Sequence, residues 1–211
     1  MKYGKALINL ALVGTLVLAG QVLAGPKAKI TPAMESLEVM HQGKAVTIRR
    51  IDDENATIPK AYARTSRHCP PFCIQPMQLG DGVETIGELE MLDYIRRLDA
   101  GEENILIIDS RMPGSTRRGM IPLAINIPYR DLKEEKMAMV MQEQFDVTPG
   151  DPVWNFRDAK TLVMYCNGPW CGQSPTAIKR LLRAGYPASR IKYYRGGMQS
   201  WESFGLTVVE P

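Results

Sequence analysis

Short apolar runs alternate with helix-like stretches along the chain from about residue 83 onward. The apolar runs lie at residues 105–108, 124–127, 161–165 and 191–194, and they have the length of buried parallel strands. Helical spacing of apolar positions fills the stretches 86–98, 132–144, 174–185 and 198–204. Strands that alternate with helices predict an α/β fold in which helices cover both faces of a parallel sheet.

Two helix starts have capping signals. Thr85 and Glu88 have the spacing of a capping box. Ser174 precedes Pro175, which favours a helix start at that point, and Gly185 is typical of the position just past a helix end. We therefore expect Thr85 and Ser174 to be the capping residues.

Residues 25–82 have a different pattern from the rest. Within residues 37–51, Val46, Ile48 and Ile51 lie among polar residues after a turn at Gly43, which predicts a short strand or hairpin. Residues 52–82 are irregular and contain four prolines. We interpret 25–82 as a β/irregular N-terminal extension that packs on a main domain of residues 83–211.

The first segment has the features of an export signal. Lys2 and Lys5 precede an apolar run over residues 6–19, and small or aliphatic residues at 22–24 favour cleavage before Gly25. Residues 1–24 are thus predicted to be a signal peptide, and the mature protein is expected to be periplasmic or secreted. An uncleaved membrane anchor over residues 6–24 is the alternative. Both interpretations place the rest of the chain outside the cytoplasm.

Composition and charge add few constraints. The chain is 45% hydrophobic and 23% charged, as is usual for a globular protein. Its formal net charge is +3, and two of the positive charges belong to Lys2 and Lys5. Because the remainder is nearly neutral, no nucleic-acid partner is expected.

The first of two cysteine pairs lies in the extension. Cys69 and Cys73 are candidates for a disulfide, because close cysteines pair in an oxidising compartment. His68 precedes them, but a structural zinc site normally takes four ligands, so no metal site is predicted. A second interpretation of this proline-rich and aromatic segment is that it docks a partner protein.

The second pair lies where chemistry is most strongly indicated. Cys166 follows the apolar run 161–165 and precedes a tight loop and a helix start, which is where open α/β sheets bind ligands. Loop amides and the helix dipole would place positive potential at its sulfur and favour the nucleophilic thiolate. Sulfur transfer, phosphate-ester hydrolysis and thiol redox chemistry all begin with a cysteine in this setting.

From about residue 85 to the end, the chain resembles the rhodanese-like family. The resemblance rests on four segments in the family's order: the aspartate–arginine strand end at 106–111, the stretch 119–128, the loop headed by Cys166, and the Gly-Gly and Trp signature at 196–201. It implies a rhodanese-like parallel sheet with helices on both faces. It also implies a sulfurtransferase of the thiosulfate sulfurtransferase type.

The resemblance assigns a role to each site residue. Cys166 would accept a sulfane sulfur from a small donor, become a persulfide, and pass the sulfur to a thiol or cyanide-like acceptor without a cofactor. Asp109 and Arg111 match residues that brace the loop and are interpreted as structural support. The substrate-binding loop would consist of Asn167, Gly168, Pro169, Trp170, Cys171 and Gly172.

Two loop positions depart from the family pattern and leave alternatives open. Pro169 has no N–H to donate. Cys171 either fills the loop or acts as a resolving thiol that attacks the Cys166 persulfide. A thiol–disulfide redox protein or a sulfur carrier that uses both cysteines is therefore the alternative function. A Cys-dependent phosphatase or arsenate reductase is disfavoured, because Gly172 stands where that chemistry needs an arginine.

The export signal makes a direct prediction. If residues 1–24 are removed on export, N-terminal sequencing of the periplasmic or secreted protein should begin at or close to Gly25. Recovery of the full-length chain from the soluble cytoplasmic fraction would contradict this prediction.

Overall fold

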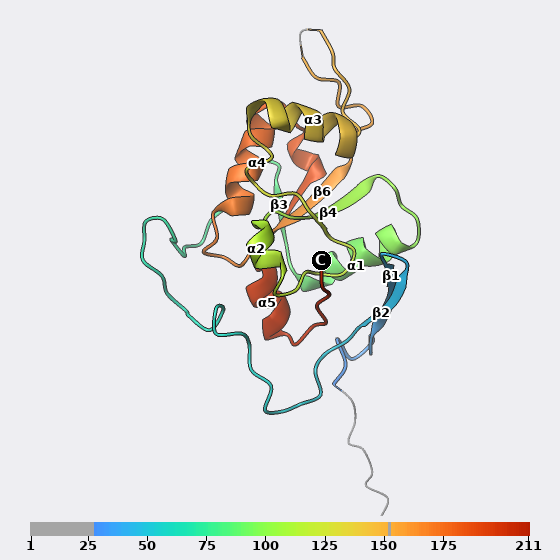
Figure 1. Cartoon of the computed structure of the whole chain (residues 1–211), viewed down its shortest axis with the longest axis vertical. Coiled ribbons are helices and arrows are strands. Elements are labelled where there is room, and N and C mark those ends of the chain that lie inside the picture. Colours follow the sequence, from blue (N-terminus) through green and yellow to red (C-terminus); the bar gives the residue numbers. More distant parts are fainter. Residues whose placement is uncertain (1–27, 152) are drawn as a thin grey trace, which may run out of the picture.

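The computed structural model of the chain describes residues 28–151 and 153–211 (Figure 1). The predicted signal peptide lies outside the described residues. Within them, no helix is both long enough and apolar enough to cross a membrane.

A five-stranded parallel sheet forms the centre of the main domain, with strand order β3-β7-β6-β4-β5. Its strands are β3 (Glu84–Ile86), β4 (Ile105–Asp109), β5 (Ile125–Asn126), β6 (Thr161–Tyr165) and β7 (Ile191–Tyr194). The helices are α1 (Glu88–Asp99), α2 (Pro113–Thr116), α3 (Glu134–Gln144), α4 (Gln173–Arg183) and α5 (Gly197–Ser203), with a 3₁₀ turn η1 (Ala188–Arg190). The predicted α/β class is confirmed.

Each face of the sheet has its own apolar core. Ile107 and Val163 point to the face that packs with α1 and α5, whereas Ile108 and Leu162 point to the face that packs with α3 and α4. Successive strand residues therefore alternate between two buried layers, which is why the strands read as continuous apolar runs.

The extension begins with a hairpin, β1 (Leu37–His41) and β2 (Lys44–Ile48), as predicted. Both turn residues, Gln42 and Gly43, have positive φ, which matches the twist of a two-residue hairpin. Val39 and Ile48 are buried in the core layer of α1 and α5. After the hairpin, the extension is an irregular segment that runs around the outside of the domain to β3 (Figure 1).

The helix ends differ from the prediction. Thr85 lies in β3, and Gly87 caps α1 while its N–H donates to the Glu90 carboxylate at 2.9 Å. Gly172 caps α4, so Ser174 falls inside the first turn. The predicted capping residues are therefore wrong in both cases, because glycine provides the cap through its backbone. Gly185 does follow the end of α4, with φ of +89°.

Candidate active site

The loop of residues 166–172 connects β6 to the N-terminus of α4, at the carboxyl edge of the sheet. Cys166 and Cys171, at its two ends, are both free thiols and both buried. The Cys166 thiol donates to the backbone carbonyl of Cys171 at 3.4 Å and also contacts the Cys171 sulfur. The two predicted thiols are thus brought together in one site.

The two sulfurs have opposite electrostatic environments. Burial raises the pKa of Cys166, and the adjacent Cys171 raises it further. The hydrogen bond from Cys166 is the main cause that lowers the pKa of Cys171 to about 6, with help from amides of Gln173 and Asn167. These opposite directions favour ionisation of Cys171 over ionisation of Cys166.

This distribution differs from the prediction that the helix N-terminus holds Cys166 as thiolate. The backbone amide of Ser174 does favour ionised Cys166. Its effect is smaller than the loss of water around a residue that is only 2% exposed. The Ser174 hydroxyl is itself buried and has no hydrogen-bond partner within residues 28–151 and 153–211.

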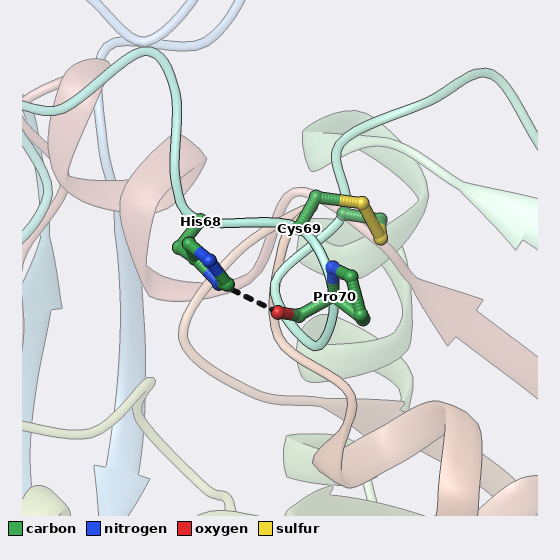
Figure 2. Close-up of a disulfide and its surroundings, with 4 residues drawn as sticks. His68, Cys69 and Pro70 are labelled. Carbon is green, nitrogen blue, oxygen red and sulfur yellow. Dashed lines mark hydrogen bonds between the residues drawn. A yellow bond between two sulfur atoms is a disulfide. The ribbon is translucent and has the colours of Figure 1, made fainter.

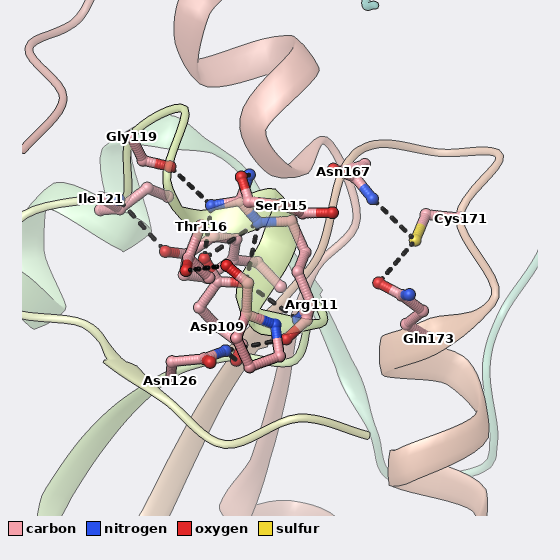
Figure 3. A network of polar contacts seen from close by, with 12 residues as sticks. Asp109, Arg111, Ser115, Thr116, Gly119, Ile121, Asn126, Asn167, Cys171 and Gln173 are labelled. Carbon is pink, nitrogen blue, oxygen red and sulfur yellow. Dashed lines mark hydrogen bonds and ion pairs between the residues drawn. The ribbon is translucent and has the colours of Figure 1, made fainter. Parts of the chain in front are cut away.

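Polar side chains surround the Cys171 sulfur (Figure 3). The Asn167 amide nitrogen donates to it at 3.6 Å, and the Gln173 side-chain oxygen lies 3.7 Å from it. Within the loop, the Cys171 N–H donates to the Gly168 carbonyl at 2.9 Å. Pro169 and Trp170 form the outer bend and are partly exposed.

The N-terminus of α5 holds the loop in place through backbone hydrogen bonds. The Met198 N–H donates to the Cys166 carbonyl at 3.0 Å, and the Gln199 N–H donates to the Asn167 carbonyl at 2.9 Å. Gly197 has φ of +55°, and a Cβ there would lie 2.3 Å from the Cys166 carbonyl oxygen. The glycine is therefore required for the close approach of helix and loop.

Asp109 and Arg111 form a fully buried ion pair beside the loop (Figure 3). Their carboxylate and guanidinium lie 2.6 Å apart, and the Arg111 N–H also donates to the Asp109 carboxylate. The guanidinium further donates to the carbonyls of Gly119 at 2.6 Å and Ser115 at 3.3 Å. These contacts tie the end of β4 to α2 and to the segment after it, and they do not involve either thiol.

Tyr62 of the extension connects this ion pair to the loop. Its side chain is 1% exposed, and its hydroxyl lies 3.3 Å from the Arg111 guanidinium and 3.4 Å from the Asn167 side-chain oxygen. Gln199 on α5 donates to the Tyr62 carbonyl at 2.8 Å and accepts from the Trp170 indole at 2.8 Å. The extension is thus part of the structure around the thiols.

The next part of the extension lies against Trp170. Cys69 and Cys73 are joined by a disulfide, and the His68 ring donates to the Pro70 carbonyl at 2.7 Å (Figure 2). Phe72, inside this small ring, packs edge-on against Trp170 with ring centroids 5.9 Å apart. The Arg67 guanidinium lies 4.1 Å from the centre of the same indole ring.

A pocket of about 300 Å³ opens above Cys171. Pro71 and Phe72 of the extension form one wall. The remaining lining consists of Tyr129, Asn167, Trp170, Cys171, Gly172, Gln173 and Thr176. Among the described residues, Cys166 is not part of this lining, so a molecule that enters the pocket meets Cys171 first.

Several of these residues were missed by sequence reasoning. Tyr62, Phe72 and Gln199 were not predicted to belong to the site. Gln199 lies inside the Gly-Gly and Trp signature and could have been noticed there. Tyr62 and Phe72 lie in an irregular stretch whose contacts depend on how the chain wraps around the domain. Among residues 28–151 and 153–211, no group of three or more metal-binding side chains gathers.

Comparison with known proteins establishes the class. The model of the rhodanese-like domain family matches residues 92–204, which is more than half of the chain. The topology of the sheet and the cysteine loop after β6 agree with this match. The chain therefore belongs to the rhodanese-like domain family.

Individual relatives are more distant. A sulfurtransferase of Allochromatium vinosum is 28% identical over 126 residues, which cover 60% of this chain and 97% of that protein. The HTH-type transcriptional regulator Rv0324 of Mycobacterium tuberculosis is 30% identical over 132 residues, or 63% of this chain and 47% of that protein. The chain thus spans about half the length of that regulator. The crystal structure of the BH2092 protein from Bacillus halodurans matches 60% of this chain and 77% of its own with a TM-score of 0.44 and 21% identity.

The buried ion pair predicts a large loss of stability in Asp109→Asn. The substitution leaves the Arg111 charge buried without its partner, so we expect the free energy of unfolding to fall by about 3 kcal/mol. Asp93→Asn is the control, because Asp93 pairs with arginines at the surface, and it should cost less than about 0.5 kcal/mol. Urea denaturation measures both, and equal small losses would contradict the prediction.

The pKa values predict which thiol reacts first. Alkylation of Cys171 by iodoacetamide should rise with pH around an inflection near pH 6, because the thiolate is the reactive form. Cys166→Ala removes the main cause of the lowered pKa, so the inflection for Cys171 should move to higher pH. Peptide mass mapping after brief exposure locates the label. An inflection near pH 6 with the label on Cys166 would mean that the thiolate resides on the other sulfur.

Proposed function

We propose that this protein is a sulfurtransferase that carries a sulfane sulfur as a persulfide on Cys166. The observation that supports this most is the pair of buried, free thiols in the loop between β6 and α4 of a rhodanese-like domain. The related protein of Allochromatium vinosum is named a sulfurtransferase, which agrees with the proposal.

Loading begins with the thiol of Cys166 and the thiolate of Cys171. As the Cys166 sulfur attacks the outer sulfur of a donor such as thiosulfate, its proton passes to the adjacent Cys171 thiolate. A sulfur–sulfur bond forms on Cys166, the donor's bond breaks, and sulfite leaves with the electron pair. Cys171 therefore acts as the proton acceptor in this step, which explains why the buried Cys166 need not be ionised beforehand.

The persulfide has hydrogen-bond donors available. The Ser174 amide favours negative charge on the Cys166 sulfur, and the buried Ser174 hydroxyl has no partner among the described residues. An added outer sulfur would give this hydroxyl an acceptor. Delivery then follows when a thiolate or cyanide attacks the outer sulfur and Cys166 leaves as thiolate.

Cys171 offers a second route for the persulfide. Its thiolate could attack the Cys166 sulfur, which releases hydrosulfide and leaves a Cys166–Cys171 disulfide. An external thiol would then have to reduce this disulfide before another cycle. The same contact between the two thiols favours thiol–disulfide exchange as the second candidate function.

We also propose that the protein works outside the cytoplasm, on the basis of its predicted export signal.

Single-turnover assays test these roles. Cys166→Ser should abolish sulfur transfer from thiosulfate to cyanide, because a serine hydroxyl cannot hold a transferable sulfur. The fold should survive this nearly isosteric change, which circular dichroism checks. Activity that persists in Cys166→Ser and disappears in Cys171→Ser would mean that Cys171 is the sulfur carrier.

Cys171→Ser separates the two routes. If Cys171 resolves the persulfide, its loss should leave the added sulfur on Cys166 and slow its release as sulfide, while the first transfer still occurs. If Cys171 only fills the loop, both half-reactions should stay within a few fold of the wild type. The intact mass of the protein after thiosulfate treatment measures the bound sulfur directly. A Cys166–Cys171 disulfide that forms in the wild type without a sulfur donor would support the redox function.

A further inference from the structure

Tyr62 belongs to the extension, which precedes the part of the chain that matches the rhodanese-like family at residues 92–204. Its side chain is nevertheless buried in the core layer of α1 and α5. Its hydroxyl lies between the Arg111 guanidinium, at 3.3 Å, and the Asn167 side-chain oxygen, at 3.4 Å. The hydroxyl therefore has a polar neighbour on either side, and the chemistry of these neighbours determines where its proton points.

The two partners of the Tyr62 hydroxyl give it a direction. A guanidinium can only donate, so Arg111 uses the hydroxyl oxygen as an acceptor. The one proton of the hydroxyl is then left for an acceptor, and it is donated to the Asn167 side-chain oxygen. Burial raises the pKa of Tyr62, so the hydroxyl keeps this proton in the pH range in which Cys171 ionises.

This hydrogen bond determines which end of the Asn167 side-chain amide faces Cys171. The amide has an oxygen at one end and a nitrogen at the other, and a half-turn of the group exchanges them. With the oxygen held by Tyr62, the nitrogen faces the Cys171 sulfur and donates to it at 3.6 Å. The reversed amide would place its oxygen against the sulfur, and that oxygen would repel a thiolate.

The backbones of Tyr62 and Asn167 are both held by Gln199 of α5. The Gln199 side-chain amide donates to the Tyr62 carbonyl at 2.8 Å. Its backbone N–H donates to the Asn167 carbonyl at 2.9 Å. Because one residue binds both backbones, the hydroxyl and the amide keep their positions relative to each other.

We propose that Tyr62 is a positioning residue for Cys171: its hydroxyl holds the Asn167 amide in the orientation that stabilises the Cys171 thiolate. Among the described residues, Asn167 has the only side-chain N–H that donates to this sulfur. In its protonated state the Cys171 thiol instead donates to the Gln173 side-chain oxygen, 3.7 Å away. The consequence for catalysis rests on the proposed function, in which the Cys171 thiolate accepts the proton of Cys166.

Other titratable and charged groups face the two ends of this chain of hydrogen bonds. Around the Cys171 sulfur they are Cys166, Tyr193 of β7 and Tyr129 of the pocket lining. Around the Tyr62 hydroxyl they are Arg111, Arg118 and Glu202. Burial raises the pKa of Tyr193, so this residue stays neutral where Cys171 ionises. Among the described residues, none with an acidic or basic side chain lines the pocket above Cys171.

Tyr62→Phe tests the proposal, with Tyr186→Phe as its matched control. Tyr186 is also buried, and its hydroxyl donates to the Lys160 carbonyl in the core layer of α3 and α4. Each substitution removes one hydroxyl, but only Tyr62→Phe frees the Asn167 amide. The inflection for alkylation of Cys171 by iodoacetamide, near pH 6 in the wild type, should rise by about one pH unit in Tyr62→Phe. It should stay in place in Tyr186→Phe.

The ultraviolet absorbance of the thiolate follows the same titration without a reagent that must enter the pocket. A rise of the inflection in both measurements would show that Tyr62→Phe changes the ionisation of Cys171. A rise in the alkylation alone would indicate altered access and would overturn the proposal.

Asn167→Ala shows whether the effect passes through the amide. The substitution removes the N–H that donates to the sulfur, so the inflection should rise at least as far as in Tyr62→Phe. In the double variant, the loss of the Tyr62 hydroxyl should change nothing further, because the group that it orients is absent. Thermal unfolding checks that each variant is folded. If Tyr62→Phe does not fold, an inflection that stays near pH 6 in Asn167→Ala overturns the proposal by itself.

Loading of sulfur from thiosulfate gives a second readout. A smaller thiolate fraction at Cys171 should slow loading of Tyr62→Phe about fivefold at pH 6, and the rate should return to that of the wild type at about pH 8. A purely structural defect would slow loading equally at both pH values, and this result would contradict the positioning role.

The outcomes separate this proposal from the proposed function. If the wild type transfers no sulfur but Tyr62→Phe still raises the inflection, the sulfurtransferase function fails while the positioning role stands. An unchanged inflection in Tyr62→Phe would overturn the positioning role, whatever the activity. Equal rises in Tyr62→Phe and Tyr186→Phe would also overturn it. So would an undiminished effect of Tyr62→Phe in the Asn167→Ala background, because the hydroxyl would then act by another route.

Discussion

The close approach of α5 to the cysteine loop is the constraint on which the site depends. Gly197 allows backbone amides of α5 to reach the carbonyls of Cys166 and Asn167, where any side chain would collide with the loop. Gln199, in the same turn, then binds both the Trp170 indole and the Tyr62 carbonyl. One helical turn therefore sets the position of the thiols, the pocket wall and the extension together.

The second organising feature is the proximity of two buried thiols, Cys166 and Cys171, whose pKa values move in opposite directions. Burial alone would keep both thiols neutral, and a buried thiolate without hydrogen bonds would be costly. The contact with Cys166 lowers the pKa of Cys171 and so favours a thiolate on this sulfur, which lies at the floor of the pocket. Cys171 is therefore both the more acidic thiol and the one that an entering molecule meets. Cys166 does not line the pocket, which limits its reaction with other molecules.

Strand positions and the α/β class could be predicted because a two-sided parallel sheet leaves continuous apolar runs, such as 161–165. The short edge strand β3 was not predicted, since three residues carry too little pattern. Helix starts were wrong because Gly87 and Gly172 cap through backbone geometry, which side-chain signals do not report. The place of Cys166 at the sheet edge followed from local pattern. Its pKa relation to Cys171 and the insertion of Tyr62 depend on tertiary packing, which a single sequence does not encode locally.

The insertion of Tyr62 has a consequence for how such a protein can diversify. The chemistry resides in the loop and the sheet, whereas one side of the entrance is supplied by a segment that precedes them in the chain. Changes at Pro71 and Phe72 can therefore alter which molecules gain entry, while the contacts of Tyr62 with Arg111 and Asn167 stay in place. The rest of the extension has less freedom to vary, because Val39 and Ile48 lie in the core of the domain and Tyr62 contacts Arg111 and, through its carbonyl, Gln199.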